Sequence, residues 1–214
     1  MAAPIRPATP DPASGMVQMT LEQFLEWEAR QDRRYEFVDG FVHAMTGATI
    51  RHSIIAGNVY RALWPAAVRA GCDVHQSDVQ VRTPAGRVYY PDVLVRCGPF
   101  GMGERHARTP CMIVEVTSPS TRPTDVGEKR EQYEAIASVA AYVVVEQAFR
   151  RLTCDVRQAD GTWSHLEVSD ATGILEFATP CVDAVLTLDA VYARTDISPP
   201  PPDIDPEPLP DPTR

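Results

Sequence analysis

The stretch YYPDVLVRC, residues 89–97, places a carboxylate at the start of an otherwise apolar run. Asp92 follows Pro91, and the residues after it are typical of a strand that is buried on both faces. A second apolar run, CMIVEVTS at residues 111–118, carries Glu115 in its middle. An isolated ionised carboxylate is costly in a protein interior, so each acid needs a hydrogen-bonding, ionic or metal partner. These two acids are the strongest functional signal in the sequence.

The N-terminal part of the sequence predicts a helix followed by a β-hairpin. Thr20 and Gln23 have the spacing of a capping box, and apolar residues at helical spacing follow them. The run RYEFVDGFVHAM, residues 34–45, has Asp39 and Gly40 between two β-rich segments. An Asp-Gly pair in that position is the signal of a two-residue hairpin turn.

The rest of the chain alternates between helix and strand signals. A second helix is expected over about residues 52–63, ending near Pro65, because proline breaks the hydrogen-bond pattern of a helix interior. The capping-box pair Asp125 and Glu128 predicts another helix, and residues 150–168 predict a second hairpin. The other β-rich runs are expected to be strands: CDVHQSDVQVRT (72–83), VYYPDVLVRC (88–97), CMIVEVTS (111–118), AAYVVVEQ (140–147) and short strands to about Tyr192.

This order of elements predicts one α/β domain, with a central mixed β-sheet flanked by helices and an N-terminal helix and hairpin. The domain is expected to span residues 20–192. Residues 1–19 and 193–214 are expected to be disordered Pro-rich tails, because the last 17 residues contain eight prolines together with acidic residues.

The composition narrows the classes of function. The chain carries a formal net charge of −9, so it has no broad basic footprint for nucleic acid, and this counts against a nucleic-acid enzyme. No apolar run is long enough for a membrane span, and the N-terminus lacks the apolar region of a secretory signal. The cysteines show neither a metal-type pair nor a disulfide spacing, so we expect reduced thiols in a cytoplasmic protein: Cys72, Cys97, Cys111, Cys154 and Cys181.

Lys129 is the third charged residue of the candidate site. On the expected helix, Lys129, Tyr133 and Ile136 share one face by their spacing. Since Tyr133 and Ile136 suit a core, the long stem of Lys129 starts from the buried face and can carry its ammonium toward the two acids. An ammonium there can orient a water molecule or stabilise charge on a phosphate. A solvated lysine on the first helical turn is the alternative.

The Pro-Asp pair at 91–92 and the run IVEVTSPSTRPTDVGEKREQYEAIASVAAYVVVE (113–146) resemble the Uma-type endonuclease family. That family belongs to the PD-(D/E)XK, restriction-endonuclease-like superfamily. The resemblance also includes RRYEFVDGFVHAM (33–45) and the start of RHSIIAGNVYRAL (51–63), and it spans roughly residues 21–188. The run from 115 to 146 is specific to the family, whereas the Pro-Asp pair by itself is not.

The resemblance implies a restriction-endonuclease-like core and an endonuclease that needs a divalent cation, Mg²⁺ with Mn²⁺ as its substitute. Asp92 and Glu115 match the two metal-binding acids. The superfamily's lysine usually stands two residues after the glutamate, where this chain has Thr117; in this family it is relocated to the next helix, where Lys129 matches it. Ala141 stands where the family commonly has an acid, which we expect to affect packing and not the metal. DNA as the substrate and a homodimer are further implications of the resemblance.

Four further residues are candidates for the site. Glu36 matches an additional active-site acid, although beside Arg34 it could form only a surface ion pair. His52 matches the family's histidine near the start of the second helix, and it could contact phosphate or simply end the helix. Ser118 and Arg122 are candidate phosphate contacts, although the composition around them is also that of an ordinary loop.

Two other functions fit the same residues. The domain could bind metal or nucleic acid without turnover, as a catalytically inactive module, although the acidic charge disfavours phosphate binding. Alternatively the acids could be a structural network that Lys129 alone satisfies, with no metal. A gel-shift salt series tests the first alternative, and calorimetry with Mg²⁺ and Mn²⁺ tests the second.

Overall fold

The computed structural model of the chain describes residues 18–45, 47–118, 124–169 and 173–197. In chain order its elements are α1 (Leu21–Glu28), β1 (Tyr35–Val38), β2 (Phe41–Ala44), α2 (Ile50–Arg69), β3 (Cys72–Gln76), β4 (Val81–Arg82), β5 (Val88–Tyr89), β6 (Val93–Cys97), β7 (Pro110–Thr117), the π-helical turn η1 (Asp125–Lys129), α4 (Arg130–Glu134), β8 (Ala141–Glu146), β9 (Leu152–Arg157), β10 (Trp163–Val168), β11 (Ile174–Phe177), β12 (Ala184–Thr187) and α5 (Leu188–Val191).

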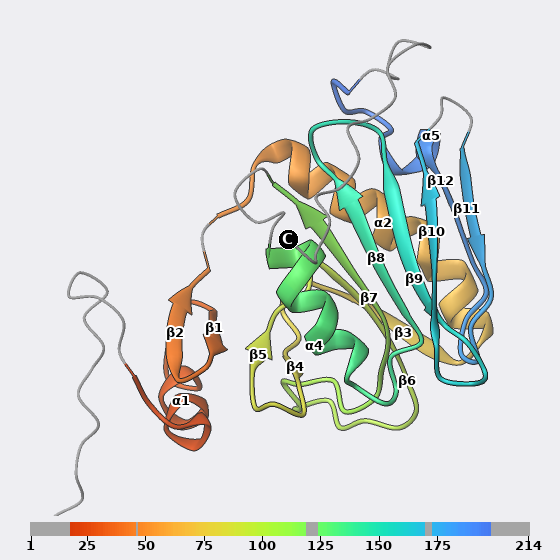
Figure 1. The fold of residues 1–214 in the computed structure, drawn as a ribbon. Helices are drawn as coiled ribbons and strands as arrows, with labels where there is room; N and C mark the ends of the chain where they lie inside the picture. Colours follow the sequence, from red (N-terminus) through yellow and green to blue (C-terminus); the bar gives the residue numbers. More distant parts are fainter. Residues whose placement is uncertain (1–17, 46, 119–123, 170–172, 198–214) are drawn as a thin grey trace, which may run out of the picture.

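A six-stranded sheet in the order β10-β9-β8-β7-β6-β3 forms the centre of the fold (Figure 1). In this sheet β7 and β8 run parallel, and all other neighbouring strands run antiparallel. A smaller sheet in the order β2-β1-β5-β4 carries the N-terminal hairpin, and β11 pairs with β12. The mixed sheet with flanking helices and an N-terminal helix and hairpin confirms the predicted fold class.

Alternation along β7 divides its side chains between the two faces of the sheet. Met112, Val114 and Val116 pack in a buried cluster that includes residues of α2, β11 and β12. Ile113 belongs to a second cluster, which includes residues of α4. Figure 1 shows α2 crossing one face of the central sheet while α4 lies over the other. Because Glu115 stands two residues after Ile113 in the strand, its side chain lies on the same face, which is the face covered by α4.

The prediction that the second helix ends near Pro65 is wrong, since α2 continues to Arg69. A proline in a helix interior is about 3 kcal/mol less favourable than alanine, because it removes a hydrogen bond and crowds the preceding turn. The stripe of Val59, Leu63 and Ala67 is completely buried and runs past the proline. Pro65 itself lies on the exposed side. Burial of this stripe against the sheet therefore outweighs the local cost.

We expect Pro65→Ala to raise the free energy of unfolding by about 2 kcal/mol. The gain in helix propensity is about 3 kcal/mol, and the greater freedom of the unfolded chain offsets about 1 kcal/mol of it. Urea unfolding measures the difference. Pro84→Ala is the matched control, because Pro84 occupies a turn closed by the Gly86 amide and the Thr83 carbonyl at 2.9 Å, and its loss should slightly destabilise. An unfolding midpoint at or below the wild-type value for Pro65→Ala would contradict the explanation.

The N-terminal helix and hairpin form as predicted. Thr20 caps α1 through a capping box, and β1 pairs with β2 around Asp39 and Gly40. These two residues have φ values of 51° and 91°, which are the positive values that a type I′ turn requires. Phe24 of α1 stacks on Phe37 of β1, with ring centroids 4.9 Å apart. Pairing of β1 with β5 then holds the hairpin beside the central domain, so that one strand of the hairpin reaches the site described below.

The predicted capping box at the start of the third helix is wrong. The helix begins with the π-helical turn η1, and Thr124 before it makes no side-chain cap. Asp125 instead forms an ion pair with Lys129 at 3.6 Å, and Glu128 forms one with Arg87 at 2.9 Å. Asp125 therefore lies inside the helical turn and not at its N-cap, and both carboxylates pair with cations. The helix continues as α4 and ends at Glu134.

The structure differs from the expectation of unpaired thiols. It pairs Cys72 with Cys97 and Cys111 with Cys181 as disulfides, and leaves Cys154 free and buried. The spacing of the cysteines gave no sign of this, because the partners are 25 and 70 residues apart and meet only through the sheet.

Both ends of the described chain contact the domain. Gln18 forms a β-bridge with Phe41, and Arg51 at the start of α2 binds Asp196 at 2.7 Å. The predicted disordered tails otherwise lie outside the described residues. Within the described part of the chain, no helix combines the length and the apolar character that crossing a membrane requires.

Candidate functional site

Glu115 lies within β7, a strand that is buried along its whole length. Only 4% of the residue is exposed. Its Oε1 accepts a hydrogen bond from the Tyr133 hydroxyl at 2.9 Å and one from the Lys129 ammonium at 3.3 Å. The acid that the sequence placed in an apolar run is thus held by two donors from one helical segment, which crosses the same face of the sheet.

Asp92 stands just before β6, at the end of the sheet where Glu115 lies. Val93 pairs with Val114, so continuing this antiparallel register by one residue brings Asp92 opposite Glu115 on the same face. From this position before the start of β6, the Asp92 carboxylate accepts the backbone N–H of Val116 at 2.7 Å. The two acids therefore lie on the same side of the sheet.

His52 approaches Asp92 from the first turn of α2. Its Nε2 lies 3.1 Å from Asp92 Oδ2, and both side chains are 17% exposed. Thr49 caps this helix by accepting the His52 backbone N–H at 3.2 Å. Burial lowers the pKa of His52, but its contacts with Asp92 outweigh burial and leave the pKa above the ordinary value. The predicted position of His52 beside the site is thus realised through a contact with an acid.

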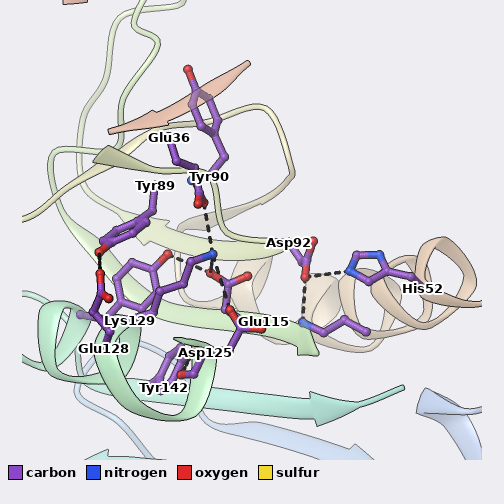
Figure 2. A network of polar contacts seen from close by, with 12 residues as sticks. Glu36, His52, Tyr89, Tyr90, Asp92, Glu115, Asp125, Glu128, Lys129 and Tyr142 are labelled. Atoms are coloured by element: carbon purple, nitrogen blue, oxygen red, sulfur yellow. Dashed lines mark hydrogen bonds and ion pairs between the residues drawn. The ribbon is translucent and has the colours of Figure 1, made fainter. Parts of the chain in front are cut away.

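Lys129 joins three carboxylates from different elements. Its ammonium lies 3.1 Å from Glu36 of β1, 3.3 Å from Glu115 and 3.6 Å from Asp125 of its own helical turn. The π-helical turn places Lys129 toward the sheet, and the ring of Tyr89 lies 5.4 Å from the ammonium. Figure 2 shows Glu36 reaching Lys129 from the opposite side to Glu115, with Asp92 and His52 beside this group.

The electrostatics of this cluster are dominated by burial. Burial raises the pKa of Glu115 well above its ordinary value, and the neighbouring carboxylates add to the effect while Lys129 opposes it. Burial alone would lower the pKa of Lys129, but Glu115, Glu36 and Asp125 outweigh it and raise that pKa well above its ordinary value. Lys129 is therefore a permanent cation, whereas ionised Glu115 is held at a cost.

The cluster contains more acids than cations. Glu36, Glu115 and Asp125 lie around the single ammonium of Lys129, and Asp92 lies near Glu115. His52, beside Asp92, adds a positive charge only when it is protonated. The site therefore holds an excess of carboxyl groups over permanent cations in a largely buried place. A cation of charge two would reduce this excess, and carboxylate oxygens are the ligands that Mg²⁺ and Mn²⁺ prefer.

The fit to a divalent cation rests on two acids and not on a closed set of ligands. Among the described residues, no three acids or histidines of this site have ligating atoms within 4.8 Å of one another. Mg²⁺ is commonly held by one or two carboxylates while it keeps several waters. Asp92 and Glu115 therefore suit an open, partly hydrated ion.

The structure brings together five of the residues predicted from the sequence: Glu36, His52, Asp92, Glu115 and Lys129. Ser118 follows β7 directly and is half-buried, whereas Arg122 lies outside the described residues. The predicted phosphate contacts of both residues stay predictions.

Two residues of the site were missed as functional residues. Asp125 was assigned to a helix cap and Tyr133 to the core, yet both contact the charged group. The four-residue spacing of Asp125 and Lys129 is a signal that could have identified Asp125. Tyr133 is completely buried, so nothing in its pattern separated a donor to Glu115 from an ordinary core residue.

Thr117 and Ala141 mark the departures from the common pattern. Thr117 donates a hydrogen bond to Glu146 at 2.9 Å, at the position where the resemblance described above implies that a lysine is more usual. Lys129 instead supplies the ammonium at Glu115 from the following helix. Ala141 is completely buried in the cluster on the α2 face, away from the acids.

Comparisons with known proteins agree with the fold. The model of the Uma2 family, described as "Putative restriction endonuclease", matches residues 21–188. The uncharacterized protein slr1290 of Synechocystis sp. is 29% identical over 154 residues, covering 71% of this chain and 81% of that protein. The uncharacterized protein sll1609 of the same organism is 25% identical over 164 residues, covering 75% and 93%.

A solved structure has the same architecture. It is the crystal structure of "a putative nuclease" from Anabaena variabilis, with a TM-score of 0.62 and 13% sequence identity, and the match covers 81% of this chain and 97% of that one. At this identity the likeness supports the restriction-endonuclease-like fold and does not assign residues.

Proposed function

Because the chain belongs to the Uma2 family of restriction-endonuclease type, we propose that it is an endonuclease that hydrolyses phosphodiester bonds of DNA with a divalent cation. The observation that carries the proposal is the buried contact between Lys129 and Glu115, 3.3 Å apart, on the same side of the sheet as Asp92. An ammonium next to two acids is the arrangement that phosphoryl-transfer chemistry requires for a water nucleophile and a developing negative charge.

Each residue of the site has a distinct role in the proposal. Asp92 and Glu115 would hold the cation. When bound, the cation would polarise a phosphate oxygen and lower the pKa of a bound water. Lys129 would orient the attacking water and stabilise the charge that builds on the phosphate. Glu36 keeps the ammonium in place through its 3.1 Å contact, and His52 orients Asp92. Glu36 and His52 are therefore positioning residues.

A plasmid-nicking assay tests the proposal. Supercoiled DNA is incubated with the purified protein, with EDTA, Mg²⁺ or Mn²⁺ in turn, and conversion to nicked or linear forms is followed. Cleavage that depends on the cation and disappears in Glu115→Gln supports it. Equal conversion by the wild type and Glu115→Gln at high protein concentration contradicts it.

His52→Asn is expected to weaken the apparent affinity for Mn²⁺ by about 10- to 100-fold. The residue contacts a proposed ligand without being one, and the loss of such an orienting contact commonly has this effect. The Mn²⁺ concentration that gives half-maximal nicking measures the change. Arg51→Gln is the matched control. Arg51 is next to His52 in the chain, but its side chain binds Asp196 at the surface and does not contact the site. An unchanged Mn²⁺ requirement in His52→Asn would contradict the proposed role of His52 in orienting Asp92.

The inactive-module alternative predicts binding without cleavage. A gel-shift series at increasing salt, with the same DNA and Mn²⁺, separates the two functions. Retained DNA that is never cut would favour a binding module, and the absence of binding at low salt would count against both functions.

A homodimer is the remaining part of the proposal. Two sites related by a two-fold axis suit an enzyme that cuts both strands of a duplex. Sedimentation velocity at several concentrations measures the assembly, and a single monomer species throughout would contradict it.

A further inference from the structure

Four of the five cysteines converge at the end of the sheet opposite the acidic cluster. Cys72 opens β3, Cys97 ends β6, Cys111 lies near the start of β7, and Cys181 lies in the connection before β12. The Sγ atoms of Cys97, Cys111 and Cys181 lie within 4.8 Å of one another. Cys72 is directly opposite Cys97 in the antiparallel pair. The five residue steps along β6 from Asp92 to Cys97 separate the two ends by about 17 Å, at 3.3 Å per residue.

The closeness of these cysteines to one another is not explained by two separate disulfides. Disulfides between Cys72 and Cys97 and between Cys111 and Cys181 satisfy the sulfur atoms in pairs, and neither pair requires the other nearby. The Cα–Cα separations are 4.3 Å and 6.6 Å, one just below the range usual for disulfides and the other close to its upper limit. Three sulfurs close to one another, with the sulfur of Cys72 bonded to one of them, are instead the arrangement that a single tetrahedral ion requires.

We propose that the reduced chain binds one zinc-class divalent ion through the thiolates of Cys72, Cys97, Cys111 and Cys181. Zinc–sulfur bonds of about 2.3 Å put the sulfurs of a tetrahedral site about 3.8 Å apart, which agrees with three sulfurs lying within 4.8 Å of one another. Binding releases the protons of the four thiols to solvent and forms four metal–sulfur bonds, with no change of oxidation state.

The surroundings suit a structural site. Cys72 and Cys111 are each only 4% exposed, whereas Cys97 and Cys181 are half-buried and give an ion access from solvent. The ligands come from three neighbouring strands and from the connection between β11 and β12. The ion would therefore hold that connection against the sheet. Thiolates select zinc over Mg²⁺, so this site is chemically separate from the carboxylate site and does not rest on the proposed function.

Cobalt titration tests the site. The protein is reduced, stripped of metal with a chelator under anaerobic conditions, and titrated with Co²⁺. We expect intense visible bands of tetrahedral thiolate-bound Co²⁺ that saturate at one equivalent and disappear when Zn²⁺ is added. Zn²⁺ should also raise the thermal unfolding midpoint of the reduced chain.

Variants decide whether the ion binds at this group of cysteines. Cys111→Ser and Cys181→Ser should each lose the bands, and the half-buried Cys181 gives a variant with less risk to folding. Cys154→Ser is the matched control and should keep them, because Cys154 is a free, buried cysteine that forms no part of the cluster. No bands in the reduced wild type, or bands that survive in both Cys111→Ser and Cys181→Ser, would overturn the proposal. A third result would also overturn it. In that case the protein purified without reductant has one titratable thiol, and the same protein binds no metal after reduction.

Discussion

Glu115→Gln is expected to lower the rate of DNA cleavage by about 1,000-fold or more while making the metal-free protein more stable. The amide has the same shape but removes a metal ligand, and metal ions contribute several kcal/mol to such reactions, where about 4 kcal/mol corresponds to 1,000-fold. The stability gain, about 1 kcal/mol, arises because one of four crowded carboxylates disappears. Lys129 still keeps Glu36 and Asp125 as partners.

The pH dependence of this gain has a definite sign. Burial raises the pKa of Glu115 in the folded chain above its value in the unfolded chain, so the folded state binds the extra proton more readily. The wild type therefore loses stability relative to Glu115→Gln as the pH rises through the folded pKa, and recovers it as the pH falls toward the ordinary glutamate range. Urea unfolding of the metal-free proteins at several pH values measures the difference.

Asp155→Asn is the matched control for Glu115→Gln. Asp155 is another carboxylate that is 3% exposed, but it binds Arg130 at 2.9 Å and His165 at 2.8 Å, outside the acidic cluster. Its loss should reduce stability and leave cleavage close to the wild-type rate. A Glu115→Gln protein that cleaves normally, or that is as destabilised as Asp155→Asn, would contradict the assignment of Glu115.

Lys129→Met is expected to reduce both stability and activity strongly. Removing the ammonium leaves the carboxylates of Glu36, Glu115 and Asp125 without their shared cation, and breaking a buried ion pair in this way costs about 3–5 kcal/mol. Cleavage should fall by about 100- to 1,000-fold, the usual effect of losing one group that stabilises transition-state charge. Denaturant unfolding and the nicking rate measure the two effects.

Two further variants separate folding from chemistry at this position. Arg130→Met removes the adjacent cation, which pairs with Glu134 and Asp155, and should leave the chemistry intact. Lys129→Arg keeps the charge and should restore most of the stability, but its planar group does not reproduce the position of the ammonium, so cleavage should stay low. Full activity in Lys129→Arg together with wild-type stability in Lys129→Met would show that the ammonium is a surface charge.

The sequence predicted the fold well where local signals and tertiary packing agree. The Thr20 capping box and the Asp39-Gly40 turn act within a few residues, and both form as expected. Pro65 shows the opposite case, because a buried stripe on α2 outweighs a local helix breaker. The cysteine cluster could not be predicted, because its members meet only through strand register and a distant connection.

In the sequence, buried charge indicated the candidate site. Glu115 and Asp92 stood out because carboxylates in apolar runs require partners, and the structure supplies them. The π-helical turn that directs Lys129 inward, and the ion pair of Asp125, depend on tertiary contacts that no local pattern reveals. The arrival of Glu36 from the N-terminal hairpin likewise depends on the pairing of β1 with β5, a contact between segments far apart in the chain.

The most direct test of the central claim is the position of a bound Mn²⁺ ion, measured by anomalous diffraction from crystals soaked with MnCl₂. We predict one anomalous peak between the carboxylates of Asp92 and Glu115 in the wild type, and no peak there in Glu115→Gln. A wild-type map without a peak at those two side chains, at saturating Mn²⁺, would contradict the metal-dependent mechanism.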